Sequence, residues 1–327
     1  MEPVRVGIVG CGKVGGLHAA ALRSVPEAAF VGSCDVDPAR AAAFAVKHGG
    51  AAFPDLDALL RAGVEAVVIG TPHPAHAGPA IRAAEAGVHV LVEKPMAATV
   101  ADCDAMLAAA ARTGVRLGVI SQRRFYEPIR RVKAAIDAGK LGTPALGLFL
   151  MYSWRDAAYY ASDPWRGRWD TEGGGVLVNQ SPHQLDMLLW FLGPAAEVTG
   201  FWANVNHPTV AVDDSAVASI RFRSGGLGSL MASVAQKPGI YTKIHVHGSN
   251  GASVGVETDR GSTFIAGMTG VTEPPLTDLW TIPGEENRLE EYQAADRAAF
   301  AGVDGTTYYH ALQFRDFVRA IRENRPP

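Results

Sequence analysis

Residues 4–15 read VRVGIVGCGKVG, an apolar run that leads directly into three spaced glycines, Gly10, Gly12 and Gly15. Gly10 permits a tight turn out of a strand, Gly12 allows a pyrophosphate to approach the backbone, and Gly15 lets a following helix lie against the sheet. The helix expected over about residues 14–24 directs its unpaired N–H groups and the positive end of its dipole at the phosphates. This segment predicts a dinucleotide-binding loop.

A second apolar run, residues 29–34, ends at Asp35, twenty positions after the last of these glycines. The Asp35 carboxylate is expected to accept hydrogen bonds from the adenosine ribose and to repel a 2′-phosphate, which favours NAD over NADP. Arg40 lies five residues on and could instead reach a phosphate, although it also fits a solvated position on the next helix. Lys13 and Val14, within the loop itself, are expected to contact the cofactor as well.

Composition restricts the classes of protein to consider. The chain has 327 residues, 48% hydrophobic and 19% charged, which fits two globular domains. A net charge of −3 without a basic block argues against nucleic acid or an anionic membrane as a partner. The sequence has no apolar stretch of membrane-spanning length and no signal peptide, and its three cysteines lack a CxxC spacing. We therefore expect a cytoplasmic protein.

The order of apolar and helical segments predicts the architecture. Up to about residue 121, short apolar runs alternate with alanine-rich helical segments, which is typical of a parallel, doubly wound sheet. The expected strands are residues 4–9, 30–34, 66–69, 88–92 and 116–120, and the expected helices are 38–48, 75–86 and 100–113. After residue 126 a helix precedes aromatic, β-prone stretches that indicate a large, open and mostly antiparallel sheet. The prediction is an α/β protein with a Rossmann domain over residues 1–123 and an α/β substrate-binding and oligomerisation domain over 124–327.

Ligands of doubly wound sheets bind at the carboxyl ends of the strands, so the residues after each run are candidates for the site. The candidates for cofactor contact there are Thr71, Pro72, His73, His76, Glu93, Lys94 and Gln122. Lys94 is followed by a proline that fixes its backbone. Partial burial and a cationic nicotinamide would lower the pKa of its amine, so that it could take or share a hydroxyl proton. The alternative is a surface lysine paired with Glu93.

The second half of the chain carries a histidine at the start of an apolar helix. His183 follows Pro182, and Asp186 stands three positions on, so both side chains share one helical face. Asp186 could fix the imidazole tautomer, cap the helix or pair elsewhere. The glycine run at residues 173–175 is expected to open space for a ligand. No metal site is predicted, because the pairs His73/His76 and His245/His247 lack further clustered ligands.

Four segments together resemble the Gfo/Idh/MocA oxidoreductases, the glucose-fructose oxidoreductase and inositol dehydrogenase family. They are the glycine loop, TPHPAHA at 71–77, AGVHVLVEKP at 86–95 and GGGVLVNQSPHQLD at 173–186. The resemblance implies that Lys94 binds the reacting hydroxyl, that Glu93 contacts the nicotinamide-side ribose, and that His183 is the acid/base histidine. Asn179 stands where an aspartate is common in the family, and an amide can orient a substrate hydroxyl but cannot take its proton.

The resemblance also implies a reaction and its partners. We expect NAD-dependent hydride transfer on a secondary alcohol of a sugar, sugar derivative or cyclitol by a homo-oligomer, a dimer or tetramer built through the second sheet. Arg124, Trp165 and Arg166 are further candidates, the first two for substrate and the last two for cofactor, since aromatic faces with arginine suit sugars. Two alternatives remain: a recycled NAD that supports epimerisation or glycosidic cleavage, and a non-catalytic dinucleotide sensor, which would not need both Lys94 and His183.

Overall fold

The computed structural model describes residues 2–259, 265 and 268–327. The chain divides into two compact units. Unit 1 contains residues 1–122, 265–270 and 306–327, and unit 2 contains residues 123–264 and 271–305. The break after residue 122 falls next to the expected boundary. The last 22 residues, which the sequence analysis assigned to the second domain, instead belong to unit 1 by their packing.

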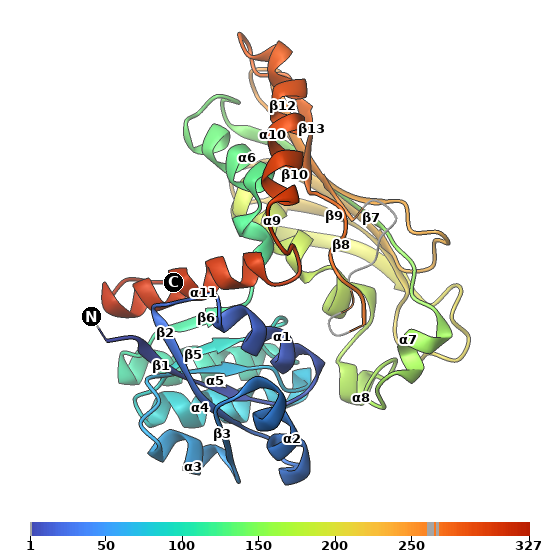
Figure 1. Ribbon diagram of the computed structural model, residues 1–327. Helices are drawn as coiled ribbons and strands as arrows, with labels where there is room; N and C mark the ends of the chain where they lie inside the picture. Colours follow the sequence, from blue (N-terminus) through green and yellow to red (C-terminus); the bar gives the residue numbers. More distant parts are fainter. Residues whose placement is uncertain (1, 260–264, 266–267) are drawn as a thin grey trace. The chain divides into compact units, whose positions relative to one another are not determined.

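Unit 1 is built on a six-stranded parallel sheet in the order β3-β2-β1-β4-β5-β6, as expected for a doubly wound fold (Figure 1). Its strands are β1 (Val4–Val9), β2 (Ala28–Cys34), β3 (Ala51–Phe53), β4 (Ala66–Ile69), β5 (His89–Val92) and β6 (Leu117–Val119). Its helices are α1 (Lys13–Leu22), α2 (Pro38–His48), α3 (Leu56–Arg61), α4 (Ala77–Glu85), α5 (Val100–Thr113) and α11 (Tyr308–Arg322), with the 3-10 turns η1 (His73–Ala75) and η2 (Gln122–Phe125), the latter leading into unit 2.

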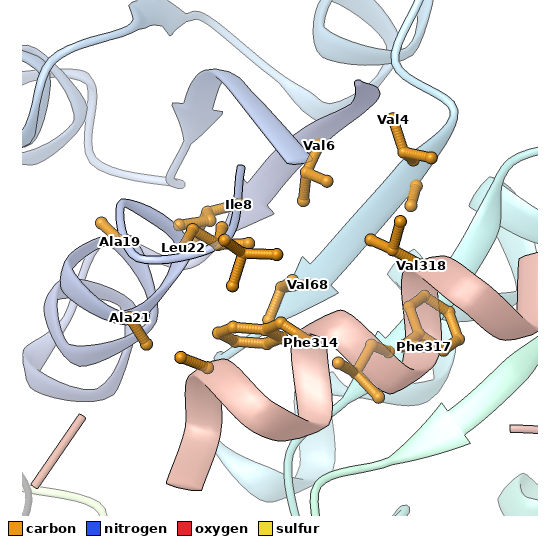
Figure 2. Close-up of a cluster of buried hydrophobic side chains, with 14 of the residues drawn as sticks. Val4, Val6, Ile8, Ala19, Ala21, Leu22, Val68, Phe314, Phe317 and Val318 are labelled. Carbon is orange, nitrogen blue, oxygen red and sulfur yellow. The ribbon is translucent and has the colours of Figure 1, made fainter. Parts of the chain in front are cut away.

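Side chains that alternate along the strands of unit 1 fill two separate apolar layers. One layer joins β1, β4 and β5 to helices α1, α2 and α11, and Phe314, Phe317 and Val318 of α11 pack against Val6 and Val68 there (Figure 2). The other layer places α3, α4 and α5 against the opposite face through neighbouring strand residues. Because helices cover both faces of the sheet, the strand sequences are nearly continuous apolar runs. A ligand can therefore reach the sheet only at the ends of the strands.

Unit 2 contains a seven-stranded, mostly antiparallel sheet in the order β13-β12-β11-β7-β10-β9-β8, with one parallel pair, β7 and β10 (Figure 1). The strands are β7 (Pro144–Tyr152), β8 (Ala195–Ala203), β9 (Ser215–Phe222), β10 (Leu227–Ser233), β11 (Tyr241–Gly248), β12 (Ser253–Thr258) and β13 (Leu276–Trp280). The helices are α6 (Glu127–Asp137), α7 (Ala157–Ala161), α8 (Trp169–Glu172), α9 (Pro182–Leu192) and α10 (Leu289–Ala301), with the π-helix η3 (Val176–Gln180) and the 3-10 turn η4 (Glu286–Arg288).

The two faces of this second sheet differ in exposure. Residues such as Phe149, Ile220 and Leu230 alternate inward and are buried. Helix α9 packs on β7 and β11, while α6 and α10 pack near the β12–β13 edge. The opposite face presents large apolar side chains to solvent, among them Phe201, which is 82% exposed, and Met231, which is 43% exposed. Contiguous exposed apolar patches are a feature of interaction surfaces in other proteins.

Candidate active site

The glycine loop after β1 has the geometry that each glycine was expected to serve. Gly10 has φ 96°, and a Cβ atom there would lie 2.9 Å from the backbone of Gly70. A Cβ at Gly15 would lie 2.2 Å from the Gly10 carbonyl oxygen, so only glycine allows α1 to pass so close to the turn. A Cβ at Gly12 would meet no heavy atom of the described residues within 4 Å. Gly12 therefore faces open space.

Asp35 ties the end of β2 to this loop. Its Oδ2 accepts the Cys11 N–H at 2.8 Å, and its Oδ1 accepts the Asp37 N–H at 2.9 Å. The Asp35 side chain is only 6% exposed, and Arg40 approaches its Oδ1 at 3.4 Å. Arg40 thus pairs with Asp35, although half of the arginine side chain stays exposed. The carboxylate still has lone pairs for a ribose hydroxyl, and it keeps a negative charge at this corner.

A cavity of about 730 Å³ in unit 1 borders the loop. Gly12 and Lys13 line it, together with Arg40 and Lys47 from α2 and Met268 from residues 265–270 of the same unit. Gly12 is the N-cap of α1, so the positive end of the helix dipole lies beside the open space at this glycine. The helix N-terminus, the lysines and the open space at Gly12 fit a diphosphate.

The loop after β4 is held by a buried histidine. The His76 ring is 0% exposed, and its two nitrogens each lie 2.9 Å from a carbonyl oxygen, that of Thr71 and that of Pro95. Burial lowers the pKa of His76, and the carbonyl contacts only partly oppose this. His76 therefore links two loops of the site through its ring. His73 is also buried, and Pro72 is exposed at the turn.

Glu93 and Lys94 follow β5 at the same carboxyl edge as the glycine loop. The Glu93 Oε2 accepts the N–H of Lys94 at 3.0 Å, and its Oε1 lies 3.0 Å from His18 Nε2 on α1. Burial alone would raise the pKa of Glu93, but His18, with further help from Lys94, more than offsets it and holds that pKa well below its usual range. Glu93 is therefore a carboxylate that orders the backbone of Lys94.

A third residue, His310 of α11, completes a buried cluster with His18 and Glu93. One donor atom from each lies within 4.8 Å of the others, close enough for a metal ion by donor type. The sequence analysis considered His73/His76 and His245/His247 for metals and missed this group. Sequence spacing alone could have suggested only His18, because it follows Gly15 by three positions and shares its helical face.

The glycine run before η3 in unit 2 serves close packing. A Cβ at Gly175 would lie 1.8 Å from the carbonyl oxygen of Asp213, and one at Gly174 would lie 2.5 Å from a Val178 methyl carbon. Asp213 also accepts the Gly175 N–H at 2.8 Å. The expectation that these glycines open space for a ligand is therefore wrong at residues 174 and 175. They are glycines because neighbouring atoms occupy the positions of a side chain.

Asn179, on η3, lies in a buried polar network. Its Nδ2 donates to Tyr159 Oη at 3.2 Å and to Glu172 Oε1, and Glu172 Oε2 accepts the Gly167 N–H at 2.5 Å. Glu172 is 0% exposed, and burial raises the pKa of its carboxyl. Sequence reasoning missed Glu172 and Tyr159. The only signal was that Glu172 directly precedes the glycine run, because a network of this kind is assembled by tertiary packing.

Arg124 and Asp186 form a bidentate ion pair within unit 2. Arg124 Nε lies 2.7 Å from Asp186 Oδ2, and its Nη2 lies 2.5 Å from Oδ1. The guanidinium also sits 4.8 Å from the Trp190 ring centroid. Asp186 was expected to fix the imidazole of His183, to cap the helix or to pair with another residue, and the structure shows the third of these. Its partner is Arg124, which was predicted to contact the substrate. His183 is 9% exposed on α9, directly after the π-helix, an element often found at functional sites.

Trp165 and Arg166 also lie in this unit. The Arg166 guanidinium is stacked 4.5 Å from the Trp165 ring and 4.3 Å from the Tyr159 ring, and it donates to Tyr159 Oη. Trp169 packs against Trp202 instead, with centroids 5.2 Å apart. Gln122, at the end of unit 1, is buried. Asn179 and Arg166 thus both contact Tyr159. Glu93 lies beside His18 and His310, which were not among the residues predicted for the site.

Two family models match this chain, one in each half of the sequence. Residues 4–121 match the family described as "Oxidoreductase family, NAD-binding Rossmann fold", and residues 129–254 match the "GFO/IDH/MocA C-terminal domain". The chain is 31% identical to an inositol 2-dehydrogenase of Rhizobium meliloti over 98% of both chains, and 30% identical to a myo-inositol 2-dehydrogenase of Thermotoga maritima over 76% of this chain and 74% of that one.

A solved structure is similar over the whole length. The WlbA dehydrogenase of Bordetella pertussis, in complex with NADH and UDP-GlcNAcA, has a TM-score of 0.86 and 27% identity, covering 100% of this chain and 90% of that one. No helix in the part of the chain that the structure describes is both long and apolar enough to cross a bilayer.

Proposed function

Because the chain belongs to the GFO/IDH/MocA oxidoreductase family, we propose that it is an NAD-dependent dehydrogenase that oxidises a secondary alcohol of a sugar, sugar derivative or cyclitol. The observation that carries the proposal is the edge of the unit 1 sheet, where the open Gly12, the carboxylate of Asp35 and the ordered Lys94 all follow parallel strands. The relatives act on inositol by name, and the similar WlbA structure holds a sugar nucleotide.

The cofactor preference follows from the residues of the loop. NAD, when bound, supplies the nicotinamide that accepts a hydride from the carbinol carbon. Gly12 and the N-terminus of α1 would hold the diphosphate, and Asp35 would accept the adenosine ribose hydroxyls. Arg40 is paired to Asp35, so the positive charge that could favour a 2′-phosphate is offset. These features support NAD over NADP.

Lys94 is the residue proposed to handle the hydroxyl proton. Its backbone N–H is fixed by Glu93, and its side chain is partly exposed at the carboxyl edge of the sheet, where a substrate can reach it. His183 is proposed as the second acid/base group. Asn179 is proposed to bind and orient a substrate hydroxyl, since an amide cannot take a proton. Its amide nitrogen is held by Glu172 and Tyr159, which fixes its orientation.

The test is a screen of polyols, sugars and cyclitols for NADH formation by the wild-type protein and by Lys94→Ala. We expect turnover with at least one compound, and a loss on the order of 10³-fold in Lys94→Ala, since general acid–base catalysis contributes about 10²- to 10⁴-fold. Lys140→Ala is the matched control, because Lys140 is an exposed lysine paired with Glu285 in unit 2. Full activity of Lys94→Ala would reject the mechanism.

The same screen separates the two alternatives. An enzyme that recycles bound NAD would change its substrate without accumulating NADH. A dinucleotide sensor would bind NADH and convert no compound, with wild type and Lys94→Ala indistinguishable.

We also propose that the protein forms a homo-oligomer through the exposed face of the unit 2 sheet. Leu146, Phe201, Val217, Leu227 and Met231 present apolar side chains on neighbouring strands there. Phe201 stands opposite Val217, and Val217 stands opposite Met231, so these three residues form a continuous row across three strands. A second copy would offer the same row, as a two-fold interface requires.

A further inference from the structure

We propose that His18 is a positioning residue for catalysis, which acts through Glu93 to fix the backbone of Lys94, with His310 closing the buried side of the cluster. The inference rests on the proposed function, since it concerns the residue assigned to the hydroxyl proton. His18 and His310 are not used in hydride transfer itself. They are, however, buried beside a carboxylate that accepts the Lys94 backbone N–H.

The cluster joins three elements that are far apart in sequence. His18 comes from α1, Glu93 from the end of β5 and His310 from the first turn of α11, all within unit 1. His18 is 0% exposed and His310 is 4% exposed, while the Glu93 side chain is 12% exposed. The His18 ring also packs against Phe314 of α11, with centroids 5.5 Å apart and an edge-to-face arrangement. The imidazole therefore has apolar contacts as well as its contact with the Glu93 carboxylate.

Both oxygens of the Glu93 carboxylate are used in this arrangement. Oε1 lies 3.0 Å from His18 Nε2, and Oε2 accepts the Lys94 N–H at 3.0 Å. A carboxylate held at one oxygen cannot turn about its terminal bond without losing the contact at the other. Removal of His18 would free this rotation and release the Lys94 amide. Since small misplacements of a reacting group cost up to about 100-fold in rate, the effect should appear in turnover.

His310 contributes as a neutral ring. Its Nδ1 lies 3.2 Å from the Thr306 carbonyl oxygen, which can only accept, so Nδ1 carries the proton. Burial and the nearby His18 lower the pKa of His310 to about 4. At neutral pH His310 therefore adds no positive charge to the cluster, and His18 and then Lys94 are the first groups that lower the pKa of Glu93. On this basis His310 fills space and supplies an acceptor nitrogen.

The charged state of Glu93 depends on the groups that face it. These are His18 from α1, His310 from α11, His76 from the turn before α4, and Lys94 beside it in the chain. Burial acts to raise the pKa of Glu93, and His18 is the strongest of the groups that lower it. Without His18 the pKa should rise, so Glu93 would become protonated as the pH falls through mildly acidic values. A protonated Glu93 is a weaker acceptor for the Lys94 N–H.

The experiment compares His18→Leu, His18→Gln and the control His245→Gln. Leucine removes the ring nitrogen that lies beside Glu93 Oε1, glutamine keeps a polar side chain that can donate, and His245 belongs to a histidine–carboxylate pair with Asp278 in the unit 2 sheet. We expect kcat to fall on the order of 10- to 100-fold in His18→Leu, with little change in the KM for NAD, and to recover partly in His18→Gln. We also expect a new loss of kcat/KM at acidic pH in His18→Leu alone, and unchanged kinetics in His245→Gln.

A second measurement needs no substrate, and it can be made on His18→Gln if the His18→Leu protein is unstable. Hydrogen exchange at the Lys94 amide should be faster on the order of 10-fold in His18→Gln and faster still in His18→Leu, and unchanged in His245→Gln. Equal exchange, kcat and pH profile in wild type and both His18 variants would overturn the proposal. A stoichiometric transition-metal ion in the purified protein would also overturn it, because His18 would then serve as a ligand. If wild type turns over no compound, the proposed function fails, and the exchange result alone decides the role of His18.

Discussion

At the scale of single residues, Asp35 combines two functions. It receives two backbone N–H groups, one on each oxygen, and its charge is proposed to exclude a 2′-phosphate. Asp35→Asn keeps the size and one acceptor oxygen, so it removes the charge together with one of the two backbone contacts. We expect the preference for NAD over NADP, measured as the ratio of kcat/KM values, to fall at least about 10-fold, which corresponds to about 1.4 kcal/mol.

A matched control is available in the same unit. Asp55 caps α3 by accepting the Ala58 N–H at 2.7 Å, so Asp55→Asn makes the same change at a capping carboxylate. Asparagine caps helices about as well as aspartate, and the cofactor preference should stay as in wild type. An unchanged NAD/NADP ratio in Asp35→Asn would mean that Asp35 serves only to hold the loop.

Residues whose role depends on position along a strand could be predicted from sequence, and residues assembled by packing could not. Asp35 and Lys94 stand directly after apolar runs, so their place at the sheet edge followed from the fold. Arg124 and Asp186 are 62 positions apart, and no local pattern indicates their ion pair. The same holds for His310, which reaches Glu93 only because α11 returns to the first sheet.

At the scale of elements, two glycines at the junction of β1 and α1 should respond differently to substitution by alanine. Gly15→Ala would force a Cβ to within 2.2 Å of the Gly10 carbonyl oxygen, so the turn and helix must separate. Overpacking against backbone costs about 1–3 kcal/mol or more, and we expect a clear fall in Tm. A Cβ at Gly12 would meet no heavy atom of the described residues within 4 Å, and the Gly12 backbone (φ −79°, ψ −166°) suits alanine.

Gly12→Ala should therefore fold as the wild type does but bind NADH on the order of 10-fold more weakly or worse, because its methyl group occupies the space meant for the diphosphate. Calorimetry or thermal melts and NADH titration measure the two effects separately. If Gly12→Ala binds NADH with the wild-type Kd, the diphosphate does not lie against this residue, and the cofactor site must be assigned elsewhere.

Helices and strands with a clear periodicity of apolar residues were predicted closely. Elements whose place depends on tertiary contacts were not. Strands β1 and β4 and helices α2 and α5 have the bounds expected from their apolar periodicity. Strand β3 was missed. The C-terminal residues were assigned to the second domain. Helix α11 instead packs on the first sheet, because Phe314, Phe317 and Val318 supply an apolar face for it (Figure 2).

At the scale of the whole molecule, domain composition is the part that sequence predicts least well. The boundary near residue 123 follows from the change in pattern after the last parallel strand. The assignment of residues 306–327 to unit 1 follows only from the packing of α11, a long-range property of the folded chain. The mostly antiparallel nature of the second sheet was by contrast predicted from its aromatic, β-prone segments.

The exposed face of that sheet yields the last prediction. Leu227 is 48% exposed on β10, next to Leu146 of β7, which is 51% exposed. Leu227→Glu would place a charge in the proposed interface between copies, where burial without a partner is costly. We expect the mass in solution, measured by light scattering after size exclusion, to fall from that of an oligomer to that of a single 34.5 kDa chain. Leu107→Glu is the control, since Leu107 is 54% exposed on α5 of unit 1. An oligomer that survives Leu227→Glu and the further change Phe201→Asp would show that the copies associate through another surface, and a wild-type monomer would show that this face binds a different partner or none.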